Sequence, residues 1–187
     1  MEPKYELTEE KIIEDGRTLY RIRAIKDFGN ITKGQSGGYV ENEFNLSHEG
    51  SCWIYDNAKV YGHAQVYGNA IVKDSAKVYS IPWIYDNAVV SGNAKVYGNC
   101  QIYGNASVGD NVEVFGDCRI FDLSSVSGSA KVHGNAHLYG RCHVCDDAQV
   151  YGNSKIYDTV TINSRARIYN NAKLYGNCTV SWEVNPL

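Results

Sequence analysis

Aliphatic residues recur at every sixth position over most of this chain. From Ile54 to Val180, twenty-two successive positions of this spacing hold isoleucine, valine or leucine, without one insertion or deletion. A small residue follows four positions after most of them, as in the unit Val96-Tyr97-Gly98-Asn99-Cys100-Gln101. A fixed period of this kind predicts a solenoid, in which each repeat packs only on its neighbours.

Each six-residue unit divides into a short strand and a corner. Around the aliphatic residue, small, polar, aliphatic and variable positions alternate, which predicts side chains pointing in and out of a strand. The second position after the aliphatic residue is Gly, Asp, Ser or Asn in every unit from Asp56 to Gly176. These residues tolerate left-handed backbone or bond to it locally, so we expect a corner there.

The residue after each aliphatic position shows that three units make one turn, because it repeats every eighteen residues. The lysine face, so named for the cations beside its ladder, has the aromatic series Tyr61, Tyr79, Tyr97, Phe115, His133, Tyr151 and Tyr169. The tyrosine face has Tyr67, Tyr85, Tyr103, Phe121, Tyr139, Tyr157 and Tyr175. The bare face has Tyr55, Lys73, Ser91, Gly109, Ser127, Cys145, Asn163 and Ser181. We therefore predict an all-β triangular prism of about seven eighteen-residue coils.

This pattern resembles the hexapeptide-repeat superfamily of single-stranded left-handed parallel β-helices. The resemblance covers roughly residues 52–181, and the left-handed winding is what it implies, since periodicity alone does not fix the hand. One departure is that tyrosine mostly follows the aliphatic residue here, where the family usually has glycine. The composition of the repeats is similar to that of uncharacterised bacterial and phage proteins rich in Tyr-Gly-Asn-Ala units, which are often described as acyltransferases.

The first 45 residues lack the period and are expected to cover the open edge of the prism, which spans residues 46–187. Within them, residues 11–25 predict a β-hairpin around the turn Asp15-Gly16. Arg21 and Arg23 are expected to face water, and Tyr20, Ile22 and Ala24 to face the core. At the other end we expect Trp182 and Pro186 to close the last edge.

Charge and composition exclude several classes of protein. The formal net charge is −3, and the repeat region is balanced, with eleven basic and eleven acidic residues in 51–187. This balance disfavours nucleic acid and membranes as partners. No apolar run is long enough for a membrane span and the start lacks a signal peptide, so we expect a cytoplasmic protein.

The six cysteines do not follow a metal-binding or disulfide pattern. Five of them, Cys52, Cys100, Cys118, Cys142 and Cys178, occupy the small-residue position, where they alternate with alanine. Free cysteine packs as a small buried residue, so we expect core packing and no metal or cofactor.

Catalysis depends on the histidines, because the superfamily's best-known activity is acyl transfer with a histidine base. His133 and His137 flank one corner and are the candidate catalytic pair. Against catalysis, His133 replaces a tyrosine of a ladder, and no unit is interrupted by a loop that could form a pocket. The sequence therefore favours a protein without catalytic activity.

Flat faces are suited to binding other proteins. The candidate binding surface on the tyrosine face is Tyr67, Trp83, Tyr85, Tyr103 and Tyr139, since tyrosine and tryptophan are favoured at interfaces. The bare face is the candidate for self-association or for packing of the N-terminal segment, through Trp53, Tyr55, Ile71, Val89, Ser91, Ser107 and Gly109.

The preferred function is a self-associating scaffold or protein-binding module, dimeric or trimeric, and the phage resemblance suggests an inhibitor of a host protein. The alternative is an acetyl-CoA-dependent acyltransferase with a site completed between subunits.

Overall fold

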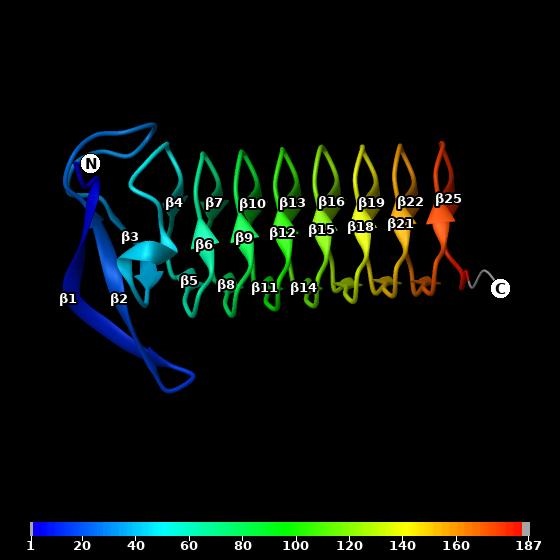
Figure 1. Cartoon of the computed structure of the whole chain (residues 1–187), viewed down its shortest axis with the longest axis horizontal. Coiled ribbons are helices and arrows are strands. Elements are labelled where there is room, and N and C mark those ends of the chain that lie inside the picture. Colours follow the sequence, from blue (N-terminus) through cyan, green and yellow to red (C-terminus); the bar gives the residue numbers. More distant parts are fainter. Residues whose placement is uncertain (1, 185–187) are drawn as a thin grey trace.

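The computed structural model describes residues 2–184, and the aliphatic period there forms an all-β parallel solenoid of about eight turns. Each turn is a triangle of short strands, and the turns stack into a straight rod (Figure 1). The near strands in Figure 1 run upward, and the chain then crosses to the far strands while moving away from the N-terminus, so the winding is left-handed. The predicted fold class is confirmed, with about eight turns where the sequence predicted about seven.

The three walls of the prism are the three predicted faces, and each is a parallel sheet in constant register, such as Lys59 opposite Lys77. The lysine face is formed by β5 (Lys59–Val60), β8 (Lys77–Val78), β11 (Lys95–Val96), β14 (Glu113–Val114), β17 (Lys131–Val132), β20 (Gln149–Val150) and β23 (Arg167–Ile168). The tyrosine face is formed by β6 (Gln65–Val66), β9 (Trp83–Ile84), β12 (Gln101–Ile102), β15 (Arg119–Ile120), β18 (His137–Leu138), β21 (Lys155–Ile156) and β24 (Lys173–Leu174). The bare face is formed by β4 (Trp53–Ile54), β7 (Ile71–Val72), β10 (Val89–Val90), β13 (Ser107–Val108), β16 (Ser125–Val126), β19 (His143–Val144), β22 (Thr161–Ile162) and β25 (Thr179–Val180).

The interior is a single apolar column. All twenty-two aliphatic positions are buried except Leu174 in the last turn, which is half-buried. The small residues four positions later are also buried, apart from Cys178, which is exposed. Packing of the cysteines in the core is thus correct for Cys52, Cys100, Cys118 and Cys142 and wrong for Cys178, because no further described turn covers it.

The corners depend on left-handed backbone at one position per unit. Every residue from Asp56 to Gly176 in that position has a positive φ. Aspartate there has a second role, since its carboxylate accepts a hydrogen bond from the backbone N–H of the corresponding corner one turn later. The Gly104 N–H, for example, lies 3.1 Å from Asp86 Oδ2. These bonds tie successive turns together along the edges of the prism.

We expect Gly98→Ala to destabilise the protein more than Gly16→Ala. Both glycines have similar φ values, +80° and +75°, so both substitutions incur the left-handed penalty of about 1–2 kcal/mol. A Cβ at Gly98 would also lie 2.7 Å from the backbone of Gly116, whereas nothing lies within 4 Å at Gly16. Alanine, unlike aspartate, gains no hydrogen bond to offset this contact. Urea denaturation of the two variants should give the lower midpoint for Gly98→Ala; equal midpoints would contradict the expectation.

The N-terminal segment is an antiparallel hairpin joined to the prism. Strand β1 (Tyr5–Glu14) pairs with β2 (Arg17–Ala24) around the predicted turn, where Asp15 and Gly16 both have positive φ. Strand β2 then pairs with β3 (Ser36–Val40), which runs parallel to β5 and extends the lysine face. The domain boundary at residue 46 stays a prediction.

The orientation of the hairpin differs in part from the prediction. Ile22 and Ala24 are buried as expected, but Tyr20 is only half-buried and Leu19 is fully buried against Tyr39 and Tyr61. Arg21 does not face water. The pairing of β2 with β3 shifts register next to it, and its guanidinium donates to the Gly37 and Asp56 carbonyls at 2.7 and 3.1 Å.

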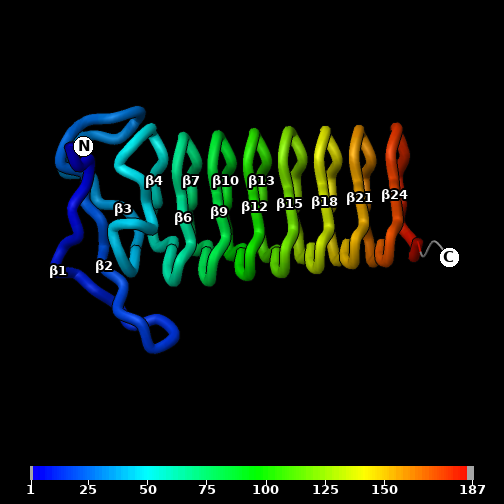
Figure 2. The backbone as a smooth tube through the Cα atoms, in the orientation of Figure 1, coloured from blue at the N-terminus to red at the C-terminus, as the bar shows by residue number. Residues whose placement is uncertain are grey.

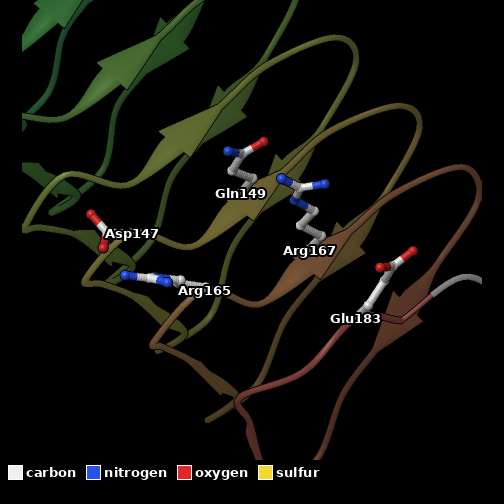
Figure 3. Close-up of a pocket in the computed structure, with 5 residues that line it drawn as sticks. All are labelled: Asp147, Gln149, Arg165, Arg167 and Glu183. Atoms are coloured by element: carbon white, nitrogen blue, oxygen red, sulfur yellow. The ribbon is translucent and has the colours of Figure 1, made fainter.

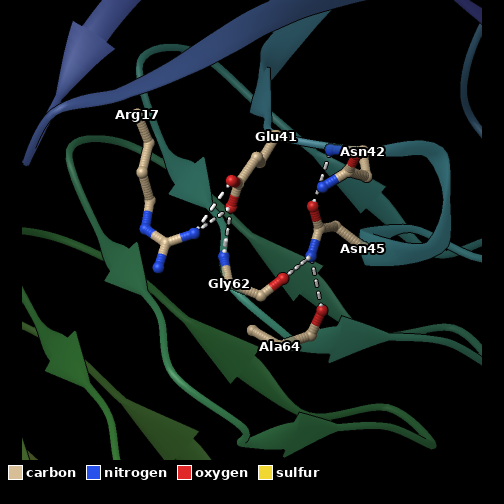
Figure 4. Close-up of polar contacts among 6 residues, drawn as sticks. All are labelled: Arg17, Glu41, Asn42, Asn45, Gly62 and Ala64. Carbon is tan, nitrogen blue, oxygen red and sulfur yellow. Dashed lines mark hydrogen bonds and ion pairs between the residues drawn. The ribbon is translucent and has the colours of Figure 1, made fainter.

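The N-terminal end of the prism presents backbone carbonyls, because N–H groups of each turn donate to the following turn. Side-chain donors of the preceding segment satisfy several of them. Asn45, at the end of the 3-10 turn η1 (Glu43–Asn45), donates to Gly62 O and Ala64 O at 3.1 and 2.8 Å (Figure 4). Glu41, paired with Arg17, accepts from the Gly62 N–H at 2.7 Å. Together these contacts cap the first turn of the solenoid.

The opposite end is less covered. Trp182, expected to seal it, is 63% exposed, so that prediction is wrong. Val184 instead pairs with Ile168 in a parallel bridge and donates to Arg167 O at 2.8 Å. Pro186 lies outside the described residues.

Candidate functional site

His133 and His137 lie on adjacent faces, on either side of the corner at Gly134. His133 is stacked between Phe115 and Tyr151, with ring centroids 4.7 and 4.8 Å apart. His137 lies in β18, in register between Arg119 and Lys155. Burial, followed by neighbouring cations, holds the pKa of both imidazoles below the usual value and so favours their neutral form.

A neutral imidazole can act as a general base, but it also needs a substrate held next to it. Figure 2 shows evenly spaced coils from β4 to the last turn, with no loop extruded from the rod. Three hollows of about 230 to 410 Å³ are present near the ends of the rod, and none of these three is lined by His133 or His137. None of these three hollows therefore provides a substrate site for the two side chains.

Sequence reasoning missed a pair on the bare face. Ser125 Oγ lies 2.6 Å from His143 Nδ1 on the adjacent strand. The two residues are eighteen apart, so the period could have revealed them. The pair resembles a nucleophile and its base, but the wall around it is flat, and the main-chain N–H groups of Ser125 and His143 already donate to the next turn. We interpret the Ser125–His143 pair as a structural contact between neighbouring strands, that is, between successive rungs of the sheet.

The candidate binding surface on the tyrosine face is continuous. Tyr67, Tyr85 and Tyr103 stack with centroids 4.9 and 4.8 Å apart, and Phe121 continues the ladder to Tyr139. Trp83 lies beside this ladder and is 45% exposed, as is Ile81 at the neighbouring corner. The structure thus places all five predicted residues on one wall.

The bare face is divided between two environments. Trp53, at its N-terminal end, is fully buried under Tyr5 and Phe28, with centroids 6.1 and 5.4 Å away. Tyr55 is half-buried against the core. The remaining predicted residues are half-buried or exposed, namely Ile71, Val89, Ser91, Ser107 and Gly109. The N-terminal segment therefore packs on the first rung of this face.

The lysine face carries ion pairs that reach across turns. Glu14, at the tip of the hairpin, lies 2.6 Å from Lys59 Nζ and also contacts Lys77. The hydrogen bonds from both ammonium groups lower the pKa of this carboxyl. The next residue, Asp15, accepts a hydrogen bond from Tyr61 Oη at 2.7 Å. The hairpin tip thus lies over the first two rungs of this face.

No metal site is present among residues 2–184, since no cluster of three or more suitable side chains occurs there. Nor does this part of the chain contain a helix long and apolar enough to cross a membrane. All six cysteines are free.

Comparison with known proteins agrees with the repeat pattern. Residues 64–80 match the family described as the YdcK β-solenoid repeat. The chain is similar to a YdcK solenoid. It is 33% identical over 99 residues to the protein of Escherichia coli (strain K12) named "Uncharacterized acetyltransferase YdcK". The match covers 48% of this chain and 30% of that protein, so this chain spans less than a third of the relative's length. The resemblance to hexapeptide-repeat β-helices is thereby supported.

Proposed function

We propose that this protein is a non-catalytic scaffold that pairs with a second copy of itself and binds other proteins through its flat walls. The observation that carries the proposal is the uninterrupted prism, whose aromatic ladders are displayed on sheets in constant register. Such walls offer large contact area at little cost in conformational entropy. The sequence favoured the bare face for self-association, but the N-terminal segment already covers the first rung of that face. We therefore place the pairing of two copies on the tyrosine face, where the charges indicate how they fit together.

One column of the tyrosine face is polarised along the rod. Its N-terminal rungs are neutral, namely Gln65, Trp83 and Gln101, whereas Arg119, Lys155 and Lys173 follow further on. A two-fold axis that pairs two such walls antiparallel sets the basic half of each copy against the neutral, aromatic half of the other. Cations over tyrosine and tryptophan rings then add to the buried area. Parallel pairing would instead place like charges together.

The mass in solution tests this proposal. Sedimentation equilibrium of the 20.8 kDa chain should show a dimer. Trp83→Lys should weaken the dimer by at least about tenfold, because it removes an aromatic anchor and adds a cation opposite the basic half of the other copy. Val89→Lys, on the bare face, is the matched control and should leave the mass unchanged. A strict monomer would refute self-association, and sensitivity to Val89→Lys alone would move the interface to the bare face.

The relative's printed name keeps acyl transfer as a second candidate, with a site completed between subunits. For such an enzyme, millimolar acetyl-CoA should raise the melting temperature, and His133→Ala should abolish that rise. An unchanged melting temperature would leave the scaffold as the remaining proposal. The narrower hypothesis of a phage-derived inhibitor requires a host protein, which a pull-down with the intact chain should recover. Cytoplasmic location belongs to the same proposal.

A further inference from the structure

One register column of the lysine face holds most of its charge. Strand pairing places its members in line along the rod, from Lys59 through Lys77, Lys95, Glu113, Lys131 and Gln149 to Arg167. The flanking aromatic ladder runs parallel to this column, ending with Tyr151 and Tyr169 at a centroid distance of 5.2 Å. Apart from Glu113, the column is therefore a row of hydrogen-bond donors beside an aromatic strip.

Carboxylates on this column are shared between lysines. Glu14, supplied by the hairpin, contacts Lys59 at 2.6 Å and also contacts Lys77. Glu113, which belongs to the column itself, lies 3.0 Å from Lys131 and 3.9 Å from Lys95. All four lysines of the column thus have a carboxylate neighbour.

The last two rungs lack this arrangement. Arg167 makes no ion pair with any described residue, and its neighbour Gln149 is a neutral rung with an amide that can also donate. A hollow of about 360 Å³ lies at this place, lined by Asp147, Gln149, Arg165, Arg167 and Glu183. Figure 3 shows the polar ends of Gln149 and Arg167 close to one another above adjacent strands.

The two acidic residues of the hollow have neighbours of their own. Figure 3 shows Arg165 extended toward Asp147, which occupies the same corner position one turn earlier. The Glu183 carboxylate accepts a hydrogen bond from Tyr169 Oη at 2.5 Å. These negative charges at the rim repel a dianion such as phosphate more strongly than they repel the single charge of a carboxylate.

The hairpin shows how an extended segment delivers such a group. Ile12 and Glu14 are two residues apart on β1 and therefore point to the same side of the strand. Ile12 packs against the cluster of Leu19, Tyr39 and Tyr61, while Glu14 spans its two lysines. With this spacing, the aliphatic residue reaches the aromatic ladder while the acidic residue reaches the donor column.

We propose that Gln149 and Arg167 form a binding site for a carboxylate carried by an extended acidic segment of a partner protein, with an aliphatic residue two positions before the acid packing on Tyr151 and Tyr169. The site repeats at the far end of the column the contact that Glu14 makes with Lys59 and Lys77. This proposal rests on the proposed function, because a scaffold is a protein that binds partner proteins. A guanidinium and an amide donor together bind a planar carboxylate with defined orientation.

The test is an NMR titration of the intact protein with a capped peptide, acetyl-Lys-Ile-Ile-Glu-Asp-amide, whose sequence is that of residues 11–15. Saturable shifts of the Arg167 Nε–H and the Gln149 side-chain amide are expected. Arg167→Met should weaken binding by roughly tenfold or more, since hydrogen bonds to charged groups are lost. Lys95→Met removes the same charge from the same column and should change the affinity less than about twofold.

Three results would overturn the site. They are equal weakening by Lys95→Met, equal binding of the peptide with glutamine in place of glutamate, and binding of inorganic phosphate as tight as that of the peptide. Sedimentation of the same samples separates the two proposals. A dimer that does not bind the peptide removes this site and leaves the scaffold, whereas a monomer that binds it leaves the site and removes self-association.

Discussion

Ala94→Leu is expected to destabilise the protein by about 1–3 kcal/mol, because the interior has no room for a larger side chain at this position. Ala94 is fully buried, and so are Ala76 and Val112, which occupy the same position one turn before and one turn after it. For a chain of this length, each kcal/mol corresponds to a melting temperature lower by about 2–4 °C. Calorimetry should therefore show a fall of several degrees.

Lys95→Leu is the control, because it adds a leucine at the next residue but on the outer surface. The Lys95 side chain is 49% exposed, and its Nζ lies 3.9 Å from Glu113. Such a surface pair contributes less than about 1 kcal/mol. If the two variants melted at the same temperature, the interior near the corners would have to be more open than the buried column indicates.

Lys4→Ala is expected to cost about 2–4 kcal/mol, by the usual cost of leaving hydrogen-bonding groups buried without partners. Lys4 is 1% exposed and its ammonium donates to the carbonyls of Glu49, Gly50 and Cys52 at 3.0 to 3.3 Å. It also lies 4.8 Å from the centroid of the Phe28 ring. Burial lowers the pKa of this lysine, yet its donors are what the carbonyls of the first turn require.

Two further variants separate the causes. Lys4→Met keeps the aliphatic stem and removes the donors, so it should be nearly as destabilising as alanine. Lys26→Ala removes a half-buried lysine of the same segment, 3.8 Å from Glu2, and should have little effect. Hydrogen exchange of residues 36–60 is the measurement, with faster exchange expected only for the Lys4 variants. Protection unchanged from that of the unsubstituted protein would show that these carbonyls do not need Lys4.

The periodic part of the structure could be predicted from the sequence because its contacts join residues at a constant sequence separation of one turn. A residue such as Val96 always meets the residues eighteen positions away, so one rule places the core, the walls and the ladders. The hairpin turn at Asp15-Gly16 could be predicted equally well, since it depends only on two residues that both tolerate a positive φ.

The contacts of the N-terminal segment could not be predicted in this way. Glu14 meets Lys77 across 63 residues, and no period relates them. The same holds for Arg21, which was expected to face water. It lies on the same side of β2 as the buried Leu19 and donates to a carbonyl of the first turn. The donors Lys4 and Asn45 are ordinary polar residues in sequence, and only the carbonyls they meet give them a role. The candidate carboxylate site was hidden for a similar reason, since it depends on which rungs lack an ion-pair partner.

The cysteines at the small-residue position have a consequence for how the rod unfolds. Because each turn contacts only its neighbours, opening can begin at one end and proceed turn by turn. The end that holds the exposed Cys178 is the less covered one, whereas Cys142, Cys118, Cys100 and Cys52 are buried at increasing depth from it. If unfolding starts at this end, the thiols should become reactive in the order of their distance from it. The order in which they react therefore reports how far unfolding has advanced along the rod.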